Sequence, residues 1–212
     1  MDVVIIGAGG HGRVVLEILQ HHRKTRVVGF LDADESLSGK TVAGRKVLGH
    51  VNLLTKLKRS GVSGAIVAIG ENRVRLEYMN RVIAAGMKLC NAVHPAAVVS
   101  RSARLGLNVV VAPGSVIGTE ARIDDGVIVN TGAVVDHECE IGRAAHVCPA
   151  AALAGRVRVG EGALIGLGAR VIQCLSIGPW ATVGAGAVAL EDVAENTVVA
   201  GVPARRLPDR QV

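Results

Sequence analysis

Two histidines in "VVDHECEIGRAAHV", residues 134–147, have neighbours that suit acid–base chemistry. Asp136 directly precedes His137, and a carboxylate beside an imidazole can fix its tautomer and raise its basicity. Glu138 is a second candidate for that role, although charged turn residues are commonly only solvated. His146 follows nine residues after His137. Most surface histidines have no function, and the adjacent carboxylate is what favours a catalytic interpretation of His137.

A glycine-rich turn near the start of the sequence is a second place for chemistry. "VVIIGAGGHG", residues 3–12, has the spacing G-x-G-x-x-G between an apolar strand and a helical segment. This pattern binds the phosphates of a dinucleotide at a helix N-terminus. His11 lies inside the turn, where its ring would contact the bound group, and Asp32 is placed to bind a ribose hydroxyl. The turn alone fits NAD and a nucleotide sugar equally well.

Composition narrows the classes of partner. The net charge of +6 suits a small polyanion such as a nucleotide or coenzyme A. The chain has one Trp, one Tyr and one Phe and no block of basic residues, so we expect no nucleic-acid partner. No apolar run reaches the length of a membrane span, and Met1 leads directly into a strand, so we expect neither membrane association nor a signal peptide.

The four cysteines favour packing over chemistry. Cys90, Cys139, Cys148 and Cys174 form no C-x-x-C pair, and no metal-ligand spacing occurs elsewhere. The sequence therefore predicts a reduced, cytoplasmic setting without a bound metal. Cys139 falls on an inward position of the repeat described below, so we expect it in the core.

The elements that must position the glycine turn alternate between strand and helix. Such alternation predicts a small parallel sheet with right-handed crossovers, about half of a full dinucleotide-binding fold. We expect a Rossmann-like α/β domain over residues 1–92, with strands over 3–7, 26–32 and 64–70 and helices near 13–22, 51–60 and 73–86.

The elements that must position the two histidines follow a period of six residues. Every sixth residue from Val93 to Val183 is Val, Ile or Leu, sixteen in succession, and small residues dominate two positions earlier. An unbroken period of six is typical of a hexapeptide-repeat parallel β-helix, in which three repeats make one triangular coil. We expect this all-β domain over residues 93–190, followed by a capping segment over 191–212.

The repeat also separates the two histidines. Nine residues correspond to one and a half faces of the triangle, so His137 and His146 should lie on different sides of one subunit. If the protein is a cyclic trimer, His137 of one subunit can approach His146 of the next.

These motifs together resemble a known family. "GAGGHG", "FLD", "VAIGEN", "VNTGAVVDHECEIG" and the terminal "AGVPARRL" are similar to those of bacterial sugar acyltransferases of the left-handed β-helix class. That class includes the sialic acid O-acetyltransferases and the nucleotide-sugar N-acetyltransferases of the UDP-bacillosamine type. The resemblance implies a left-handed coil, acetyl-CoA as cosubstrate, and a homotrimer with active sites between subunits.

The resemblance also implies roles for individual residues of the coil. His137 matches the general base, Asp136 the acidic residue that orients it, and Asn130 a further residue of the active site. His146 and Leu167 match positions on the acetyl-CoA side, as does Ala185, where a close relative has glycine. On the first domain, the nucleotide-sugar site would include Gly9, Gly10, His11, Asp32, Ala33 and Gly70.

The expected activity is therefore acetyl transfer to the amine of a UDP- or GDP-linked 4-amino-4,6-dideoxysugar. A sugar O-acetyltransferase of the sialic acid type is the nearest alternative. A dinucleotide-binding protein with a structural coil is a third possibility from another class. No residue type in the sequence decides between an amine and a hydroxyl as the acceptor.

Overall fold

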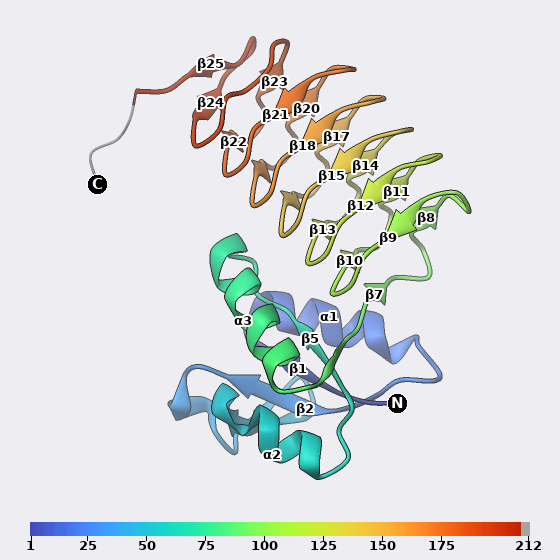
Figure 1. The fold of residues 1–212 in the computed structure, drawn as a ribbon, viewed down its shortest axis with the longest axis vertical. Coiled ribbons are helices and arrows are strands. Elements are labelled where there is room, and N and C mark those ends of the chain that lie inside the picture. Colours follow the sequence, from blue (N-terminus) through green and yellow to red (C-terminus); the bar gives the residue numbers. More distant parts are fainter. Residues whose placement is uncertain (209–212) are drawn as a thin grey trace. The chain divides into compact units, whose positions relative to one another are not determined.

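A computed structural model describes residues 1–208 of the chain, so the last four residues of the expected capping segment lie outside the described part. The chain divides into two compact units, Met1–His94 and Pro95–Val212. Figure 1 shows a mixed α/β unit in blue to teal and a stack of short strands in green to red. No helix within residues 1–208 combines the length and the apolar character needed to cross a membrane.

The first unit is built on one sheet whose central strands, Asp2–Ile6 and Gly64–Val67, are short and almost fully apolar. The strand order is β3-β4-β2-β1-β5-β6, and all neighbours are parallel except β3 and β4. Such continuous apolar runs are typical of parallel strands that are buried on both faces. The strands are β1 Asp2–Ile6, β2 Arg26–Asp32, β3 Thr41–Val42, β4 Arg45–His50, β5 Gly64–Val67 and β6 Lys88–Leu89.

Helices cover this sheet on both faces. Val4 and Ile6 of β1 belong to a core cluster that includes Leu54 of α2 and Met79 of α3. Side chains alternate along a strand, so Val3 and Ile5 face the opposite side, where α1 buries its own apolar stripe. The helices are α1 Gly10–Gln20, α2 Leu54–Arg59 and α3 Asn72–Ala84, with 3₁₀ turns at η1 Glu35–Leu37 and η2 Val51–Leu53. The short β7 Ala92–Val93 ends the unit.

Two features of this unit differ from the expectation. Helix α1 begins at Gly10, inside the glycine motif, and not near Arg13. The antiparallel pair β3–β4 was not expected, because "RKVLGH" is half polar and shows no clear alternation. The pair lies at the edge of the sheet, next to β2, and β4 buries residues of one face only. This explains the polar residues of β4.

The second unit is a parallel β-helix of two-residue strands, visible in Figure 1 as stacked arrows. Each residue pairs with the residue eighteen positions later, as Val135 does with Leu153, so one coil contains eighteen residues. The strands form three sheets, one for each side of the coil.

We number these coil sheets by their strands. Sheet 1 contains β10 Val110–Val111, β13 Ile128–Val129, β16 His146–Val147, β19 Leu164–Ile165, β22 Thr182–Val183, β24 Val198–Ala200 and β25 Arg205–Arg206. Sheet 2 contains β8 Val98–Val99, β11 Val116–Ile117, β14 Val134–Val135, β17 Ala152–Leu153, β20 Arg170–Val171 and β23 Val188–Ala189. Sheet 3 contains β9 Arg104–Leu105, β12 Arg122–Ile123, β15 Glu140–Ile141, β18 Arg158–Val159 and β21 Ser176–Ile177.

The core of the coil consists of the two inward columns that the period predicts. Every aliphatic residue of the period from Val111 to Val183 is buried, and so are the small residues two positions earlier. Cys139 occupies one of these small positions and is fully buried, as expected. Uniform aliphatic and small side chains fill identical coils, which is why the coil needs almost no aromatic residues.

The coil continues past the last aliphatic residue of the period, within the expected range of 93–190. Ala189 is buried in an inward position and β23 pairs in register with β20. Alanine substitutes there for the larger aliphatic residues of earlier coils. The antiparallel strand β25 then pairs with β24 at the edge of sheet 1.

Candidate active site

A cavity in the first unit lies beside the glycine turn. It has a volume of about 330 Å³, and residues from the ends of β1, β2 and β5 and from the start of α1 line it. These lie at the carboxyl ends of parallel strands, the usual ligand position in such sheets. The cavity brings together all six residues that the resemblance assigned to the nucleotide sugar: Gly9, Gly10, His11, Asp32, Ala33 and Gly70.

Two glycines of the turn are required by the backbone. Gly7 has φ +101°, a conformation that side chains rarely adopt. A Cβ on Gly12 would lie 2.0 Å from the carbonyl oxygen of Gly7, so helix α1 can approach the turn this closely only with glycine there. The first turn of α1 thereby faces the cavity, and the N–H groups of a first helical turn have no partner within the helix. This arrangement favours an anion.

Asp32 at the end of β2 fixes the shape of the turn. Its Oδ2 accepts a hydrogen bond from the Ala8 N–H at 2.7 Å, and its Oδ1 accepts one from the Asp34 N–H at 2.9 Å. Each carboxylate oxygen retains a lone pair for a ligand. Asp32 therefore holds the glycine turn whether or not it also contacts a ribose.

His11 lines the cavity as a neutral group. Its Nε2 is buried and has no hydrogen-bond partner within residues 1–208. Burial, together with the nearby charge of Arg75, lowers the pKa of His11 to about 4. Arg75 itself is fully buried and donates to the carbonyls of Ile69 and Gly70 at 2.8 and 3.0 Å. The unpartnered nitrogen at a cavity wall is suited to a hydrogen bond with a ligand.

His137 lies in the turn between β14 of sheet 2 and β15 of sheet 3. Its Nδ1 lies 2.9 Å from Oε2 of Glu138. A carboxylate only accepts hydrogen bonds, so Nδ1 carries the proton and Nε2 of the neutral ring is left as the basic nitrogen. Asp136, the residue expected to orient the ring, instead accepts a hydrogen bond from the His137 backbone N–H at 2.7 Å. Glu138 adopts φ +57°, a left-handed turn conformation.

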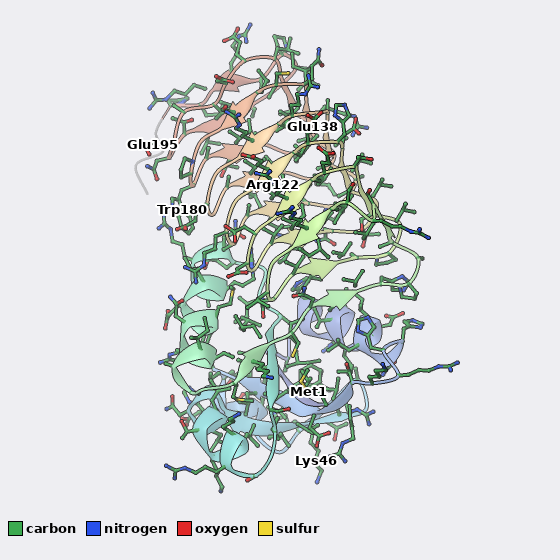
Figure 2. The ribbon with its side chains drawn as sticks, turned by 45° about the vertical axis from the view of Figure 1, so that its right-hand side comes forward. Met1, Lys46, Arg122, Glu138, Trp180 and Glu195 are labelled. Carbon is green, nitrogen blue, oxygen red and sulfur yellow. The ribbon has the colours of Figure 1, made fainter. Side chains whose placement is uncertain are left out.

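Glu138 is shared between His137 and an arginine of the next coil. Arg156 Nε donates to the same Oε2 at 3.0 Å. Hydrogen bonds from His137 and Arg156 lower the pKa of the Glu138 carboxyl, so it is ionised at neutral pH. Figure 2 shows Glu138 at the outer edge of the coil, on the side away from Trp180 in that view. A polar depression of about 680 Å³ borders this edge and includes Glu138 and Arg156.

Gly155 packs directly against the imidazole ring of His137. A Cβ on Gly155 would lie 2.4 Å from both Cε1 and Nε2 of His137. Sequence reasoning missed Gly155 and Arg156. The signal that finds them is the coil length, because they lie eighteen residues after His137 and Glu138.

Asn130, expected in the active site, and the residues expected on the acetyl-CoA side lie near the neighbouring corner, between sheets 1 and 2. Asn130 Nδ2 lies 3.1 Å from His146 Nε2. Leu167 and Ala185 are exposed and follow β19 and β22 in adjacent coils, where the Gly186 N–H donates to the Leu167 carbonyl at 2.8 Å. His137 and His146 thus lie at different corners of one chain and contact different partners.

Two of the cysteines among the described residues are not suited to catalysis. Burial raises the pKa of Cys139 and of Cys148 to about 11, so neither thiol is an activated nucleophile. Among the residues that the structure describes, no group of three or more His, Cys, Asp or Glu side chains is arranged to hold a metal. A larger depression of about 770 Å³ runs along sheet 3, but it lacks a histidine or cysteine.

Comparison with known proteins identifies the family. Residues 2–82 match the family described as the PglD N-terminal domain. The chain is 45% identical to PerB from Caulobacter crescentus, solved with CoA and GDP-perosamine, with a TM-score of 0.94 and coverage of 98% of both chains. It is 44% identical to a histidine-to-asparagine variant of perosamine N-acetyltransferase from the same organism, with a TM-score of 0.95 and coverage of 99% of this chain and 98% of that chain.

Two further relatives agree with this match. The acetyltransferase domain of PglB from Neisseria gonorrhoeae FA1090, solved with acetyl coenzyme A, is 38% identical, with a TM-score of 0.91 and coverage of 97% and 98%. UDP-N-acetylbacillosamine N-acetyltransferase of Bacillus subtilis (strain 168) is 37% identical over 113 residues. That match spans 52% of this chain and 50% of the curated relative, so it extends over only half of that protein.

These matches confirm the fold class, a Rossmann-like α/β unit followed by a left-handed parallel β-helix. They also confirm the resemblance found in the motifs, because the identity extends over nearly the whole of the two Caulobacter chains. The chain therefore belongs to the family of nucleotide-sugar N-acetyltransferases that these proteins represent, and it is an acyltransferase.

Proposed function

We propose that this chain transfers the acetyl group of acetyl-CoA to the amine of a UDP- or GDP-linked 4-amino-4,6-dideoxysugar. The observation that carries the mechanism is the His137–Glu138 contact of 2.9 Å, which leaves Nε2 as a free base. Relatives of 38% identity or more were solved with acetyl coenzyme A or with CoA and GDP-perosamine, which supports the two substrates.

The reaction is a direct transfer. The sugar amine attacks the thioester carbonyl carbon, and His137 Nε2 accepts the proton that the amine loses. The C–S bond breaks, and the proton passes from the imidazolium to the CoA thiolate, so that an amide and free CoA are formed. Glu138 stabilises the imidazolium while it exists. Asp136 holds the backbone of His137, and Asn130 is a further residue of the active site. His146, Leu167 and Ala185 act on the acetyl-CoA side.

The nucleotide occupies the cavity of the first unit. The first turn of α1 with Gly9 and Gly10 binds the diphosphate through backbone N–H groups, and His11 contributes Nε2 as an uncharged hydrogen-bonding group. Asp32, Ala33 and Gly70 line the remainder of the site.

A homotrimer completes the site. Outward side chains of sheet 2 form a mostly apolar column of Val98, Val116, Val134, Ala152 and Val188, which Arg170 interrupts, and Val98 is 63% exposed. The corresponding column of sheet 3 is Arg104, Arg122, Glu140, Arg158 and Ser176. An exposed apolar face marks an interface, and closed rings are the common solution for identical subunits.

The position of sheet 2 supports sites that lie between subunits. The His137 corner borders sheet 2 on one side, and the Asn130–His146 corner borders it on the other. In a ring closed through sheet 2, the His137 corner of one subunit meets the acetyl-CoA corner of its neighbour. Val134→Glu should give a folded monomer that has lost turnover. Light scattering would detect the monomer, and thiol release from acetyl-CoA would measure the loss of turnover. A monomeric wild type would overturn the trimer.

We further propose a cytoplasmic location, where free thiols such as the four cysteines of this chain stay reduced.

The proposed function is tested by release of free thiol from acetyl-CoA with a panel of UDP- and GDP-linked 4-amino-4,6-dideoxysugars. We expect release with one sugar, a mass gain of one acetyl group, and a loss of about a hundred- to ten-thousand-fold in His137→Ala. His21→Ala, on the exposed end of α1, is the matched histidine control and should retain activity. Release only with sugars that lack the amine would show an O-acetyltransferase instead.

A further inference from the structure

The turn at residues 155–156, one coil after His137, contacts both His137 and Glu138. The Arg156 N–H donates to the His137 carbonyl at 2.9 Å, so the turns at 137–138 and 155–156 are stacked directly. Glu138 and Arg156 share left-handed backbone conformations, with φ +57° and +62°. Equivalent residues of stacked turns therefore have the same backbone conformation, which places the two side chains next to each other.

Two contacts from this second turn reach the His137 ring. Arg156 Nε donates at 3.0 Å to Oε2 of Glu138, the same oxygen that accepts from His137 Nδ1 at 2.9 Å. Gly155 lies under the ring, where a Cβ would be 2.4 Å from Cε1 and Nε2. The Glu138 carboxylate is thus held between the His137 imidazole and the Arg156 guanidinium, while the imidazole packs against the backbone of Gly155.

Stability does not explain this arrangement. The Arg156 and Glu138 side chains are 62% and 42% exposed, and exposed ion pairs contribute little to folding. The same coil contains a comparable pair, Arg158 with Glu140 at 3.7 Å and exposures of 74% and 50%, which has no histidine beside it. Arg158 is therefore a matched control for the charge and exposure of Arg156.

We propose that Arg156 is a positioning residue for the acyl transfer at His137. Through Glu138 it holds the imidazole in the orientation and tautomer that present Nε2 to the amine. Its charge also weakens the attraction between Glu138 and the protonated ring, which allows the proton to leave for the CoA thiolate. This inference rests on the proposed role of His137 as the general base.

The charged groups at this edge come from several turns and strands, and Arg104, Arg122, Glu140 and Arg158 line the same depression as Glu138. Asp136 and Glu138 come from the turn of His137 itself, and Arg156 comes from the next coil. Arg101 and Glu120 occupy the corresponding turns of earlier coils. Of these, Glu138 and Arg156 form the chain of contacts that ends at the ring Nδ1, so a change at Arg156 reaches the base through Glu138.

The test compares Arg156→Gln, Arg156→Lys and Arg158→Gln with the wild type in steady-state kinetics across pH. In Arg156→Gln we expect kcat to fall about tenfold with KM for the nucleotide sugar unchanged, since a misplaced base slows chemistry without weakening binding. The acid limb of the kcat–pH profile should move to higher pH, because Glu138 then holds the protonated ring more strongly. Arg156→Lys should recover part of both effects, and Arg158→Gln should show neither.

A raised KM with unchanged kcat would overturn the inference, because it would mean that Arg156 binds the substrate phosphates directly. Unchanged kinetics and pH profile in Arg156→Gln would overturn it as well.

A measurement without turnover separates this inference from the proposed function. Nitrogen NMR of the histidine rings, with the His137 signal assigned by His137→Gln, reports which nitrogen carries the proton. We expect the Nδ1–H tautomer in the wild type and a mixture of tautomers in Arg156→Gln. A wild type that is inactive with every nucleotide amino sugar would remove the proposed function, whereas an unchanged tautomer in Arg156→Gln would remove the positioning role.

Discussion

His11 in the first unit and His137 in the coil are opposite kinds of histidine. His11 is enclosed at a cavity wall, its Nε2 has no partner within the described residues, and burial lowers its pKa to about 4. His137 lies on an exposed turn, and Glu138, Arg156 and Gly155 hold its ring. The buried Nε2 of His11 is open to a hydrogen bond with a ligand. In His137, the contact of Nδ1 with Glu138 fixes the ring and leaves Nε2 to accept a proton.

The largest effect on this comparison is expected from a substitution at Gly155, which packs against the His137 ring. In Gly155→Ala the new Cβ displaces the ring by the width of a methyl group, and misplacement of about 1 Å can cost about a hundredfold in rate. We expect kcat to fall by about that factor, with an unchanged melting temperature, because an exposed ring can rotate away. Kinetics and thermal unfolding of the same preparation measure both. If the activity falls only together with the melting temperature, Gly155 does not position the His137 ring.

The buried ring is tested through the pH dependence of stability. Below about pH 6.5 the unfolded chain protonates His11 while the folded chain stays neutral down to about pH 4, so stability falls as the pH decreases through this window. This residue should contribute about 2 kcal/mol of the stability lost between about pH 7 and pH 5. Hydrogen exchange at β1 and β5 amides measures the loss, and His11→Gln should remove that part.

His21→Gln is the control for this titration, since His21 is exposed at the end of α1. An equal effect of both variants would mean that His11 is not the buried titrating group.

The smallest expected effect concerns the glycine turn. The two carboxylate oxygens of Asp32 accept from the Ala8 N–H and the Asp34 N–H, and Asp32→Asn replaces one of them with an amide nitrogen that cannot accept. We expect KM for the nucleotide sugar to rise about tenfold, in line with the loss of about one hydrogen bond to a charged group, while kcat changes little. A fall in kcat at constant KM would contradict the assignment of Asp32 to binding.

The regular parts of the molecule were predictable from the sequence, and the local contacts were not. A period of six fixes which side chains point inward, so the buried column from Val111 to Val183 follows from residue types alone. The glycine turn and Asp32 were recognisable because backbone sterics demand glycine at Gly7 and Gly12. The six residues assigned to the nucleotide also line one cavity.

The partner of the His137 ring could not be read in the same way. Asp136 and Glu138 are both adjacent carboxylates, and the left-handed backbone at Glu138 is invisible in its residue type. Arg156 and Gly155 contact the histidine only across a coil, so their roles depend on stacking in three dimensions. The β3–β4 pair was missed because an edge strand buries one side only and shows a weak apolar pattern.

The division between binding and chemistry is tested most directly by calorimetry and kinetics on His11→Gln and His137→Ala with the nucleotide amino sugar that the wild type acetylates. We expect His137→Ala to bind that sugar with the affinity of the wild type while turnover falls about a hundred- to ten-thousand-fold. We expect His11→Gln to bind it more weakly and to retain kcat at saturating substrate. Weakened binding in His137→Ala, or a lost kcat with intact binding in His11→Gln, would contradict this division.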